Sequence, residues 1–422
     1  MASKIEHRER TAVSEWLLLA LIVSLGFVKP AVAYPIVYTD AIFLVLLAAF
    51  AIEILLGKRR FQWRGGYWVL LLYVLSFTPS LLASPDPGQS AFKLATQLYL
   101  VALAMITAEI VNSEREMQRA VLAWLAATGV VAIIAVLSLA AFAWAPEGSL
   151  YQYSRYHFGT LPPGNYPRLA LTFFNANMLC NYLTVSLGLL LVAERRRWLS
   201  RRLCALLFAG IGIAALPTLS PGLGGLALVV GLWLWVTRRQ DSPRIARASL
   251  VGGLAVATLF VVATAVTPIP HPTAPFLIGI PATELVLAPS GRFLTWSAAA
   301  AEFLRHPLVG HGIGIGAVDV RYAAPSGNLQ TLTDGHNMLL NIAAQCGLFG
   351  VLGLVALIAY AVRVTLPWRG DGDPSNGLRT GLGIAFVAAF VYQGLGGSFE
   401  DSRHLWVLLG LVMAAGHPRG WK

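Results

Sequence analysis

The chain of 422 residues contains few charged residues, since Asp, Glu, Lys and Arg make up only 12% of it. Soluble domains carry about twice that share. Apolar residues account for 57% of the chain, and the mean hydropathy is +0.67. This composition excludes an ordinary soluble protein. The chain also has only three cysteines, all in or beside apolar runs, so no disulfide framework is expected.

Motifs that bind metals or nucleotides are also scarce. The sequence has no H-E-x-x-H and no cluster of cysteines. The only D-x-D, Asp371-Gly372-Asp373, is expected to form a solvated turn. The alternating glycines between Gly310 and Gly316 lack the strand-then-helix context of a nucleotide loop, so they favour a tight turn. We therefore expect no metal and no cofactor.

What the sequence does contain is apolar runs of membrane length. A bilayer-spanning helix needs roughly 20 apolar residues, and the chain has many such runs, so we predict an all-α polytopic membrane protein with a single domain, residues 1–422. The first run follows a charged start and lacks a cleavage site, so we expect it to be retained. The predicted transmembrane helices, about twelve, are 14–33, 36–56, 66–84, 91–111, 119–144, 169–193, 203–219, 222–237, 248–266, 336–362, 379–397 and 404–417.

The basic residues are distributed unevenly between the two sets of connections. The net charge of +11 suggests nucleic acid, but 23 of the 31 Lys and Arg residues fall on one set, which includes both termini. Such an excess marks the cytoplasmic side of a membrane protein. We therefore predict cytoplasmic termini, membrane lipids rather than nucleic acid as partners, and an outward-facing loop at 267–335 between the ninth and tenth spans. Within this loop we expect short amphipathic helices, one of them from Arg292 to Leu304 near the membrane surface.

Two of the few outward arginines are candidates for binding an anion. Arg168 stands before a span, and Asn175 and Asn177 are predicted to lie within two helical turns of it. Amides in that position should face a wet cavity or pair inside the bundle. Arg292 begins the amphipathic helix, and two guanidinium groups could hold a diphosphate. The alternative for Arg168 is contact with lipid phosphates.

His336 is the strongest catalytic candidate, because it stands beside Asn337 at the predicted start of a helix. A neutral imidazole can accept a proton near pH 7, although a lone histidine is more often structural. Asp334 could orient His336, but we favour a helix cap for it. His311 is a second, ambiguous candidate.

Other ionisable residues are expected to be structural or solvated. Arg305 and His306 should end the amphipathic helix and contact solvent or headgroups. Arg403 belongs to the turn 398–406, which is expected to be a solvated, salt-bridged turn. The alternative is that this turn lines the mouth of a cavity.

Three blocks, in this order, resemble the O-antigen ligase family, which also holds polysaccharide polymerases and protein O-oligosaccharyltransferases. The likeness runs from about Arg168 to Trp406. The blocks are RLALTFFNANMLCNYL, SGRFLTWSAAAAEFLRHPLVGHGIGIG and HNMLLNIAAQCGLFG. Two positions depart from the family pattern. Pro221 stands where members often have Arg, and Gln345 stands where they often have Glu.

The resemblance implies a GT-C-like membrane glycosyltransferase in the bacterial inner membrane, independent of metal and acting at the periplasmic face. The donor would be a glycan on undecaprenyl diphosphate, and the acceptor a sugar of lipid A-core. A polymerase or a protein O-oligosaccharyltransferase would use the same donor. A transporter is a further alternative, but the halves of the chain show no matching repeat.

The roles expected for the candidate residues follow from this chemistry. Arg168 and Arg292 would stabilise the leaving diphosphate, and His336 would accept or orient the hydroxyl of the acceptor, which gives inversion at the anomeric carbon. Further substrate contacts are expected from residues that lie near these three in the predicted topology: Asn175, Asn177, Asn337, His311 and Arg403.

Overall fold

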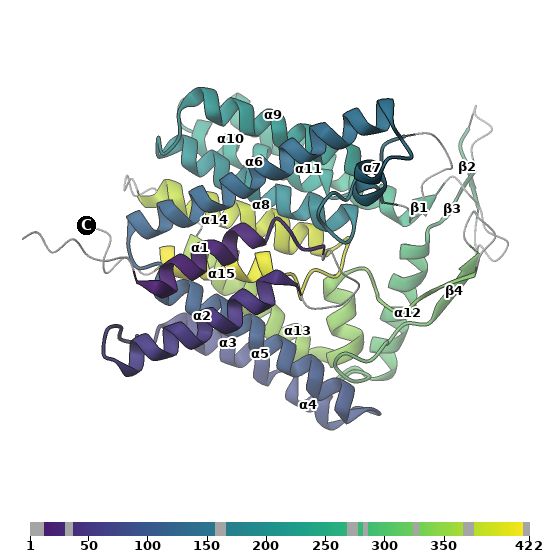
Figure 1. Cartoon of the computed structure of the whole chain (residues 1–422). Helices are drawn as coiled ribbons and strands as arrows, with labels where there is room; N and C mark the ends of the chain where they lie inside the picture. Colours follow the sequence, from purple (N-terminus) through teal and green to yellow (C-terminus); the bar gives the residue numbers. More distant parts are fainter. Residues whose placement is uncertain are drawn as a thin grey trace, which may run out of the picture.

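The computed structural model describes residues 12–29, 37–156, 166–267, 277–281, 286–323, 329–365 and 375–416. These residues form a bundle of helices with five short strands at one end (Figure 1). The helices are α1 (Val13–Ser24), α2 (Tyr38–Leu55), α3 (Gly65–Leu75), α4 (Thr78–Leu82), α5 (Pro87–Ile110), α6 (Glu114–Trp144), α7 (Ser149–Ser154), α8 (Ala176–Arg195), α9 (Arg201–Ala215), the 3-10 turn η1 (Leu216–Thr218), α10 (Leu223–Arg238), α11 (Pro243–Ala265), α12 (Gly291–Arg305), α13 (Met338–Thr365), α14 (Ser375–Phe386), the π-helical turn η2 (Val387–Tyr392) and α15 (Arg403–Ala415). The strands are β1 (Val266–Thr267), β2 (Ile278–Gly279), β3 (Val286–Pro289), β4 (Val320–Ala323) and β5 (Leu329–Leu332).

A helix lies at each of the twelve predicted spans. Eight helical segments are long and apolar enough to cross a membrane, and four shorter apolar ones are α1, α10, α15 and Gly377–Tyr392. The prediction of a helical, polytopic membrane protein is therefore confirmed. Twelve crossings and a GT-C-like architecture remain predictions.

Three predicted spans differ clearly in their boundaries. The span predicted at 14–33 ends as a helix at Ser24. The span 66–84 is divided into α3 and α4 by a turn at Ser76–Phe77. The span predicted from residue 169 begins only at Ala176, because Asn175 is extended (φ −147°) and its side chain accepts the Met178 N–H at 2.7 Å. Asn175 therefore lies at the start of this helix, and the expectation that it lies deep within a span is wrong.

Helices α8 and α15 form the centre of the bundle. In the most apolar 18-residue stretch of α8, 83% of the residues are buried. In α15, every residue from His404 to Ala415 is buried. The corresponding stretch of α11 is only 17% buried, and it packs on α10 where Gly231 faces Gly253. Small residues allow such close approach of membrane helices. The apolar surface of the outer helices is what lipid contact requires.

The outward loop predicted at 267–335 contains one helix and several short strands in its described residues. Strands β1, β3 and β2 form one antiparallel sheet in that order, and β4 pairs with β5. The amphipathic helix predicted at Arg292–Leu304 is confirmed as α12. Its buried face is Gly291, Thr295, Ala299 and Glu302.

Helix α12 is attached to the bundle at both ends. At its start, Ser290 caps Phe293 N–H at 3.3 Å, and its hydroxyl donates to the Thr264 carbonyl at 2.5 Å. After its end, the carbonyl of Pro307 accepts the Leu348 N–H of α13 at 2.8 Å. Helix α12 therefore bridges the end of α11 and the kinked start of α13.

The kink of α13 is at Gly347, whose φ is +61° and ψ −158°. A Cβ atom there would lie 2.4 Å from the backbone carbon of Leu308. Glycine is needed for both reasons, since other residues rarely adopt this conformation and the turn after α12 leaves no room for a side chain.

We expect Gly347→Ala to lower the thermal unfolding temperature of the purified protein more than Gly57→Ala. Both glycines have positive φ, but nothing lies within 4 Å of a Cβ at Gly57. The control therefore carries only the backbone strain, about 1–3 kcal/mol, whereas Gly347→Ala adds a clash with backbone. Equal unfolding temperatures for the two variants would contradict the close packing of α12 and α13.

Candidate functional site

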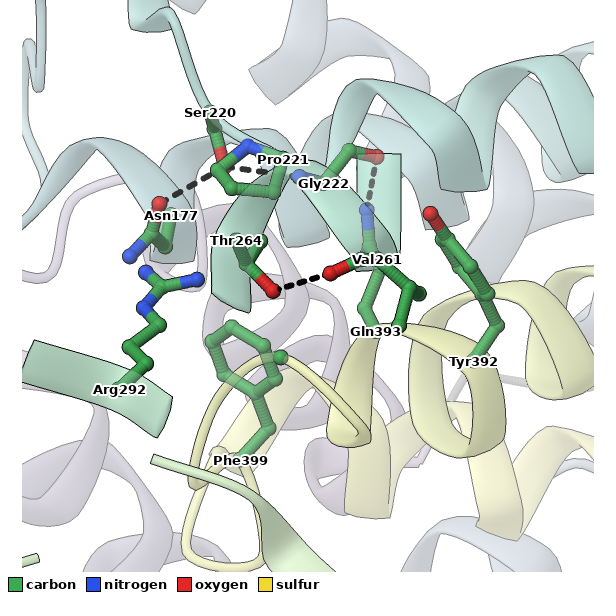
Figure 2. A pocket seen from close by; sticks show the side chains of 11 residues that line it. Asn177, Ser220, Pro221, Gly222, Val261, Thr264, Arg292, Tyr392, Gln393 and Phe399 are labelled. Atoms are coloured by element: carbon green, nitrogen blue, oxygen red, sulfur yellow. Dashed lines mark hydrogen bonds between the residues drawn. The ribbon is translucent and has the colours of Figure 1, made fainter. Parts of the chain in front are cut away.

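Arg292, at the start of α12, points into a small pocket at the end of the bundle that carries the outward loop (Figure 2). The enclosed volume is about 20 Å³, enough for roughly one water molecule. Among the described residues the lining offers a guanidinium, amides, hydroxyls and backbone but no carboxylate, imidazole or thiol, so it suits an anion rather than a metal ion. The pocket is lined by Asn177, Ser220, Pro221, Gly222, Val261, Thr264, Arg292, Tyr392, Gln393, Gly396 and Phe399.

The floor of the pocket is a buried amide network. Gln393, which follows the π-helical turn η2, donates to the Gly222 carbonyl at 2.6 Å and to Thr184 at 2.9 Å. It accepts from Asn181 at 2.6 Å. Buried amides with such partners hold their orientation. A glutamine inside an apolar run is a sequence signal for such a role, and this signal was missed.

The turn between α9 and α10 brings Asn177 into the pocket. Ser220 donates to the Asn177 side-chain oxygen at 2.8 Å and accepts the Gly222 N–H at 3.0 Å. Pro221 lies between these residues and lines the same pocket as Arg292. Proline therefore stands at the pocket wall where family members often have an arginine. Asn175, in contrast, caps α8.

Arg168 and Arg292 lie close enough to influence each other. Burial, and after it the positive charge of Arg168, lower the pKa of Arg292 to about 10. Burial likewise lowers the pKa of Arg168, whose guanidinium carbon lies 4.8 Å above the centre of the Tyr156 ring. Two neighbouring cations in a partly buried site favour binding of an anion with more than one charge.

The backbone of His336 is held in an uncommon conformation. Its φ is +45°, which is unusual for a residue with a side chain. The His336 N–H donates to Asp334 at 2.6 Å, and its carbonyl accepts from the indole of Trp296 at 3.5 Å. Thr295, also on α12, donates to the Gly335 carbonyl at 3.2 Å. Helix α12 thus positions both Arg292 and the loop that carries His336.

The helix cap expected of Asp334 is made by Asn337 instead. The Asn337 side chain accepts the Leu340 N–H at 3.1 Å and donates to the Leu395 carbonyl at 3.0 Å. Asp334 accepts from the backbone of His336 and from the Ser398 hydroxyl, and its carboxylate lies 3.7 Å from His336 Nδ1. Asp334 is two residues before His336, so its side chain forms a local turn with the His336 N–H and does not cap α13.

The surroundings of His336 favour the neutral form of its imidazole. Its side chain is 40% exposed, and partial burial lowers its pKa below the ordinary value. The Asp334 charge acts against this shift, and the Arg292 charge adds to it. His336 does not line the pocket around Arg292, but its loop is held by the same helix, α12. A neutral ring at that place can accept a proton.

The two other predicted substrate ligands have structural partners elsewhere. Arg403 forms two hydrogen bonds with Asp40 of α2, one of them 2.7 Å long. His311 Nδ1 lies 3.0 Å from Glu302. Neither residue lines the pocket around Arg292 in the part of the chain that the structure describes.

The turn 398–406 is salt-bridged, as expected, through Asp401 and Arg403, but it is not solvated throughout. Its side chains go to different helices: Asp401 pairs with Lys93 of α5, and His404 contacts Asn181 of α8. Glu400 and His404 are buried. This turn therefore ties α15 to the interior of the bundle.

Glu400 is a buried carboxyl group whose role the sequence did not show. Its Oε1 accepts from Asn341 at 2.6 Å, while Oε2 has no hydrogen-bond partner among the described residues. Gln345 donates to the same Asn341 at 3.1 Å and accepts the Gly314 N–H at 2.8 Å. A glutamate at position 345 could not make both bonds. The nearby carboxyl group comes from Glu400 instead.

Burial, and after it the negative charges of Asp401 and Asp334, raise the pKa of Glu400 to about 8. The folded chain therefore retains a proton on Glu400 at pH values where the unfolded chain, with the ordinary glutamate pKa of 4.5, has lost it. Because the pKa is higher in the folded chain, the free energy of unfolding falls as the pH rises from 4.5 to about 8.

We expect Glu400→Gln, which mimics the neutral acid, to flatten the fall in unfolding temperature between pH 4.5 and about 8. An unchanged slope would contradict a protonated Glu400.

Residues 205–355 match a family model described as O-antigen ligase. The matched region runs from α9 to α13 and contains α12, Arg292 and His336, whereas Arg168 lies before it. No curated protein matches the chain. The match confirms the resemblance seen in the sequence blocks: residues 205–355 are similar to the O-antigen ligase family, and they lie within a helical membrane protein.

Proposed function

We propose that the protein is a periplasmic glycosyltransferase that moves a glycan, the O-antigen, from undecaprenyl diphosphate to a sugar of lipid A-core. The family match supports a ligase or polymerase type of activity in general. The observation that carries the proposal is electrostatic: the charge of Arg168 acts on Arg292, and that of Arg292 acts on His336. Two cations and one neutral base thus share a site.

The two arginines suit the leaving group of such a donor. A lipid diphosphate carries several negative charges, and its charge at the bridging oxygen grows as the glycosidic bond breaks. Guanidinium groups bind phosphate oxygens in pairs. The enclosed part of the pocket takes only about one water molecule, so the diphosphate would bind at its mouth, between Arg292 and Arg168. Asn177 would support the Arg292 side of that mouth.

The transfer would proceed in one step. The acceptor hydroxyl oxygen attacks the anomeric carbon, His336 takes the hydroxyl proton, and the bond between that carbon and the diphosphate oxygen breaks. The electron pair of that bond leaves with the diphosphate, where Arg168 and Arg292 stabilise it. Attack from the opposite face inverts the anomeric configuration. Asp334 would hold the loop of His336 in place through the 2.6 Å backbone bond.

The proposed orientation puts this site outside the cytoplasm. Arg292 is at the start of α12, and His336 directly precedes α13. Both helix starts lie at the end of the bundle that carries the 267–335 loop, as does the end of α11 (Figure 1). The basic residues concentrate on the connections assigned to the other side. We accordingly assign the protein to the inner membrane as one domain, with cytoplasmic termini and a periplasmic loop at 267–335.

Reconstitution with purified lipid-linked glycan tests the proposed reaction. Transfer to lipid A-core is the expected result, and the new linkage should be inverted when its configuration is read by NMR. Lengthening of the donor glycan would indicate a polymerase, and transfer to a protein hydroxyl a protein O-oligosaccharyltransferase. Substrate flux without glycan transfer would indicate a transporter, and a retained configuration would exclude the one-step mechanism.

Replacing Arg292 or Arg168 with Ala should slow transfer by roughly 10²–10³-fold, since each removes one group that stabilises the leaving diphosphate. Arg321→Ala is the matched control, because Arg321 belongs to the same outward loop but is 74% exposed and pairs with Asp319. The rates are measured with equal amounts of folded protein in proteoliposomes. Equal rates for Arg292→Ala and Arg321→Ala would refute a role in catalysis.

His336→Ala should reduce the transfer rate by about 10²–10⁴-fold, the usual contribution of a general base. Because burial lowers the pKa of His336, the wild-type rate should hold until the pH is below the ordinary histidine value and then fall. Asp334→Asn removes a charge that raises this pKa, so it should move the acid limb to lower pH. A pH profile that does not move would argue against His336 as the base.

A further inference from the structure

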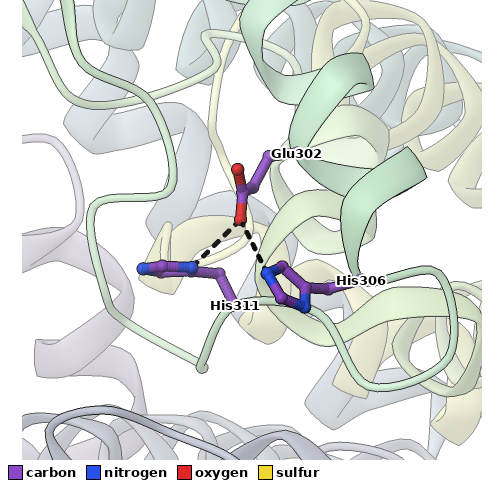
Figure 3. A group of neighbouring side chains, drawn as sticks. All are labelled: Glu302, His306 and His311. Carbon is purple, nitrogen blue, oxygen red and sulfur yellow. Dashed lines mark ion pairs between the residues drawn. The ribbon is translucent and has the colours of Figure 1, made fainter.

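The end of α12 carries a cluster of one carboxylate and two imidazoles, apart from the proposed reaction site (Figure 3). Its members are Glu302 and His306, one helical turn apart, and His311 from the following turn. One ligand atom from each lies within 4.8 Å of the others. The sequence gave no reason to group them, since they match no metal motif and His306 was expected to contact solvent.

The distances fit a single metal ion. The Glu302 Oε1 atom lies 3.0 Å from His311 Nδ1 and 3.6 Å from His306 Nε2. Zinc bonds to nitrogen and oxygen of about 2.0–2.2 Å in a tetrahedron put neighbouring ligand atoms roughly 3.3 Å apart. The observed spacings lie on either side of that value. A small rotation of the side chains would therefore be enough to bring all three atoms onto one ion.

The backbone that presents His311 is built closely against α13. Its N–H donates to the Ala344 carbonyl at 2.9 Å. Gly310 before it has a φ of +74°, and a Cβ there would lie 2.3 Å from the Gln345 backbone. Since the turn cannot shift without breaking these contacts, His311 is held opposite Glu302 without any ion. Such preorganisation lowers the cost of binding.

The environment of the three residues suits ion entry and retention. Glu302 is on the buried face of α12, with a side chain only 9% exposed. A carboxylate in that position is unfavourable unless it is paired. Its Oε2 accepts from Arg305 at 2.9 Å, which leaves Oε1 directed at the two rings. The side chains of His306 and His311 are 51% and 37% exposed, so an ion can reach them from solvent.

We propose that Glu302, His306 and His311 form a binding site for one divalent transition-metal ion, of which Zn²⁺ is the expected type. Two imidazoles and one carboxylate are typical ligands of zinc, and the fourth position would be taken by water. Magnesium and calcium prefer oxygen ligands and are not expected to bind. The ion would fix the end of α12 to the turn on α13. It takes no part in the proposed glycan transfer.

Zinc titration of the full chain tests the site. The protein carries no histidine tag, is purified in detergent and is stripped with a chelator before calorimetry. We expect one saturable Zn²⁺ per chain, a higher unfolding temperature with Zn²⁺ and no effect of Mg²⁺. Co²⁺ in place of Zn²⁺ should give the absorption bands of a four-coordinate ion. His311→Gln and the double variant Glu302→Gln/His306→Gln should each weaken binding by more than about 100-fold, beyond the loss typical of outer-shell residues.

His336→Gln is the matched control for metal binding. His336 is exposed to a similar degree, 40%, and lies 3.7 Å from a carboxylate, but it has no second imidazole in its cluster. Its Zn²⁺ affinity should equal that of the wild type. The proposal is overturned if the wild type shows no saturable binding, if Mg²⁺ competes equally, or if the ligand variants bind as well as His336→Gln. Loss of Zn²⁺ binding with intact glycan transfer would leave the proposed enzyme activity standing.

Discussion

Two guanidinium groups, those of Arg168 and Arg292, lie near each other in a partly buried site. The rest of the structure depends on this constraint. Burial and the charge of Arg168 both lower the pKa of Arg292 to about 10, so its charged form is held at a cost. In the part of the chain that the structure describes, the pocket around Arg292 is lined by amides, hydroxyls, backbone and apolar side chains, none of which carries a negative charge. A bound polyanion would reduce the repulsion between the two guanidinium groups. Its hydrogen bonds to them would replace those that it loses to water. The site is therefore suited to bind most tightly when negative charge on the ligand is greatest.

Helix α12 transmits this constraint to the rest of the protein. Its first residues carry Arg292, its middle holds the backbone around His336 through Trp296, and its last turn carries Glu302. The helix is itself tied to α11 by Ser290 and to α13 by the turn at Pro307. A single helix thus sets the distance between Arg292 and the backbone of His336. This arrangement explains why a short amphipathic helix outside the bundle has so many hydrogen bonds to it.

The helical elements could be predicted from sequence because apolar runs of membrane length leave few other choices. Arg168, Arg292 and His336 stood out because polar residues near a membrane surface need a reason. Helix starts were less predictable: Asn175 and Asn337 act through side-chain caps, which override the hydrophobic pattern locally. Glu400 could not be placed, because its surroundings come from α5, α13 and the outward turn, far apart in the chain. The same holds for the grouping of Glu302 with His311, which depends on a glycine turn packed on α13.

The π-helical turn at Val387–Tyr392 limits how the length of this segment could vary. A π-turn contains one residue more than the α-helix would need, and one residue corresponds to a rotation of about 100° around the helix axis. Everything after the turn is therefore out of phase with the preceding α14, and Gln393 faces Gly222 and Thr184 only because of that offset. Loss of a single residue from this stretch would restore the regular α-helical phase and swing the glutamine toward a different neighbour. The number of residues in this segment, and not only their types, therefore decides whether Gln393 reaches the pocket.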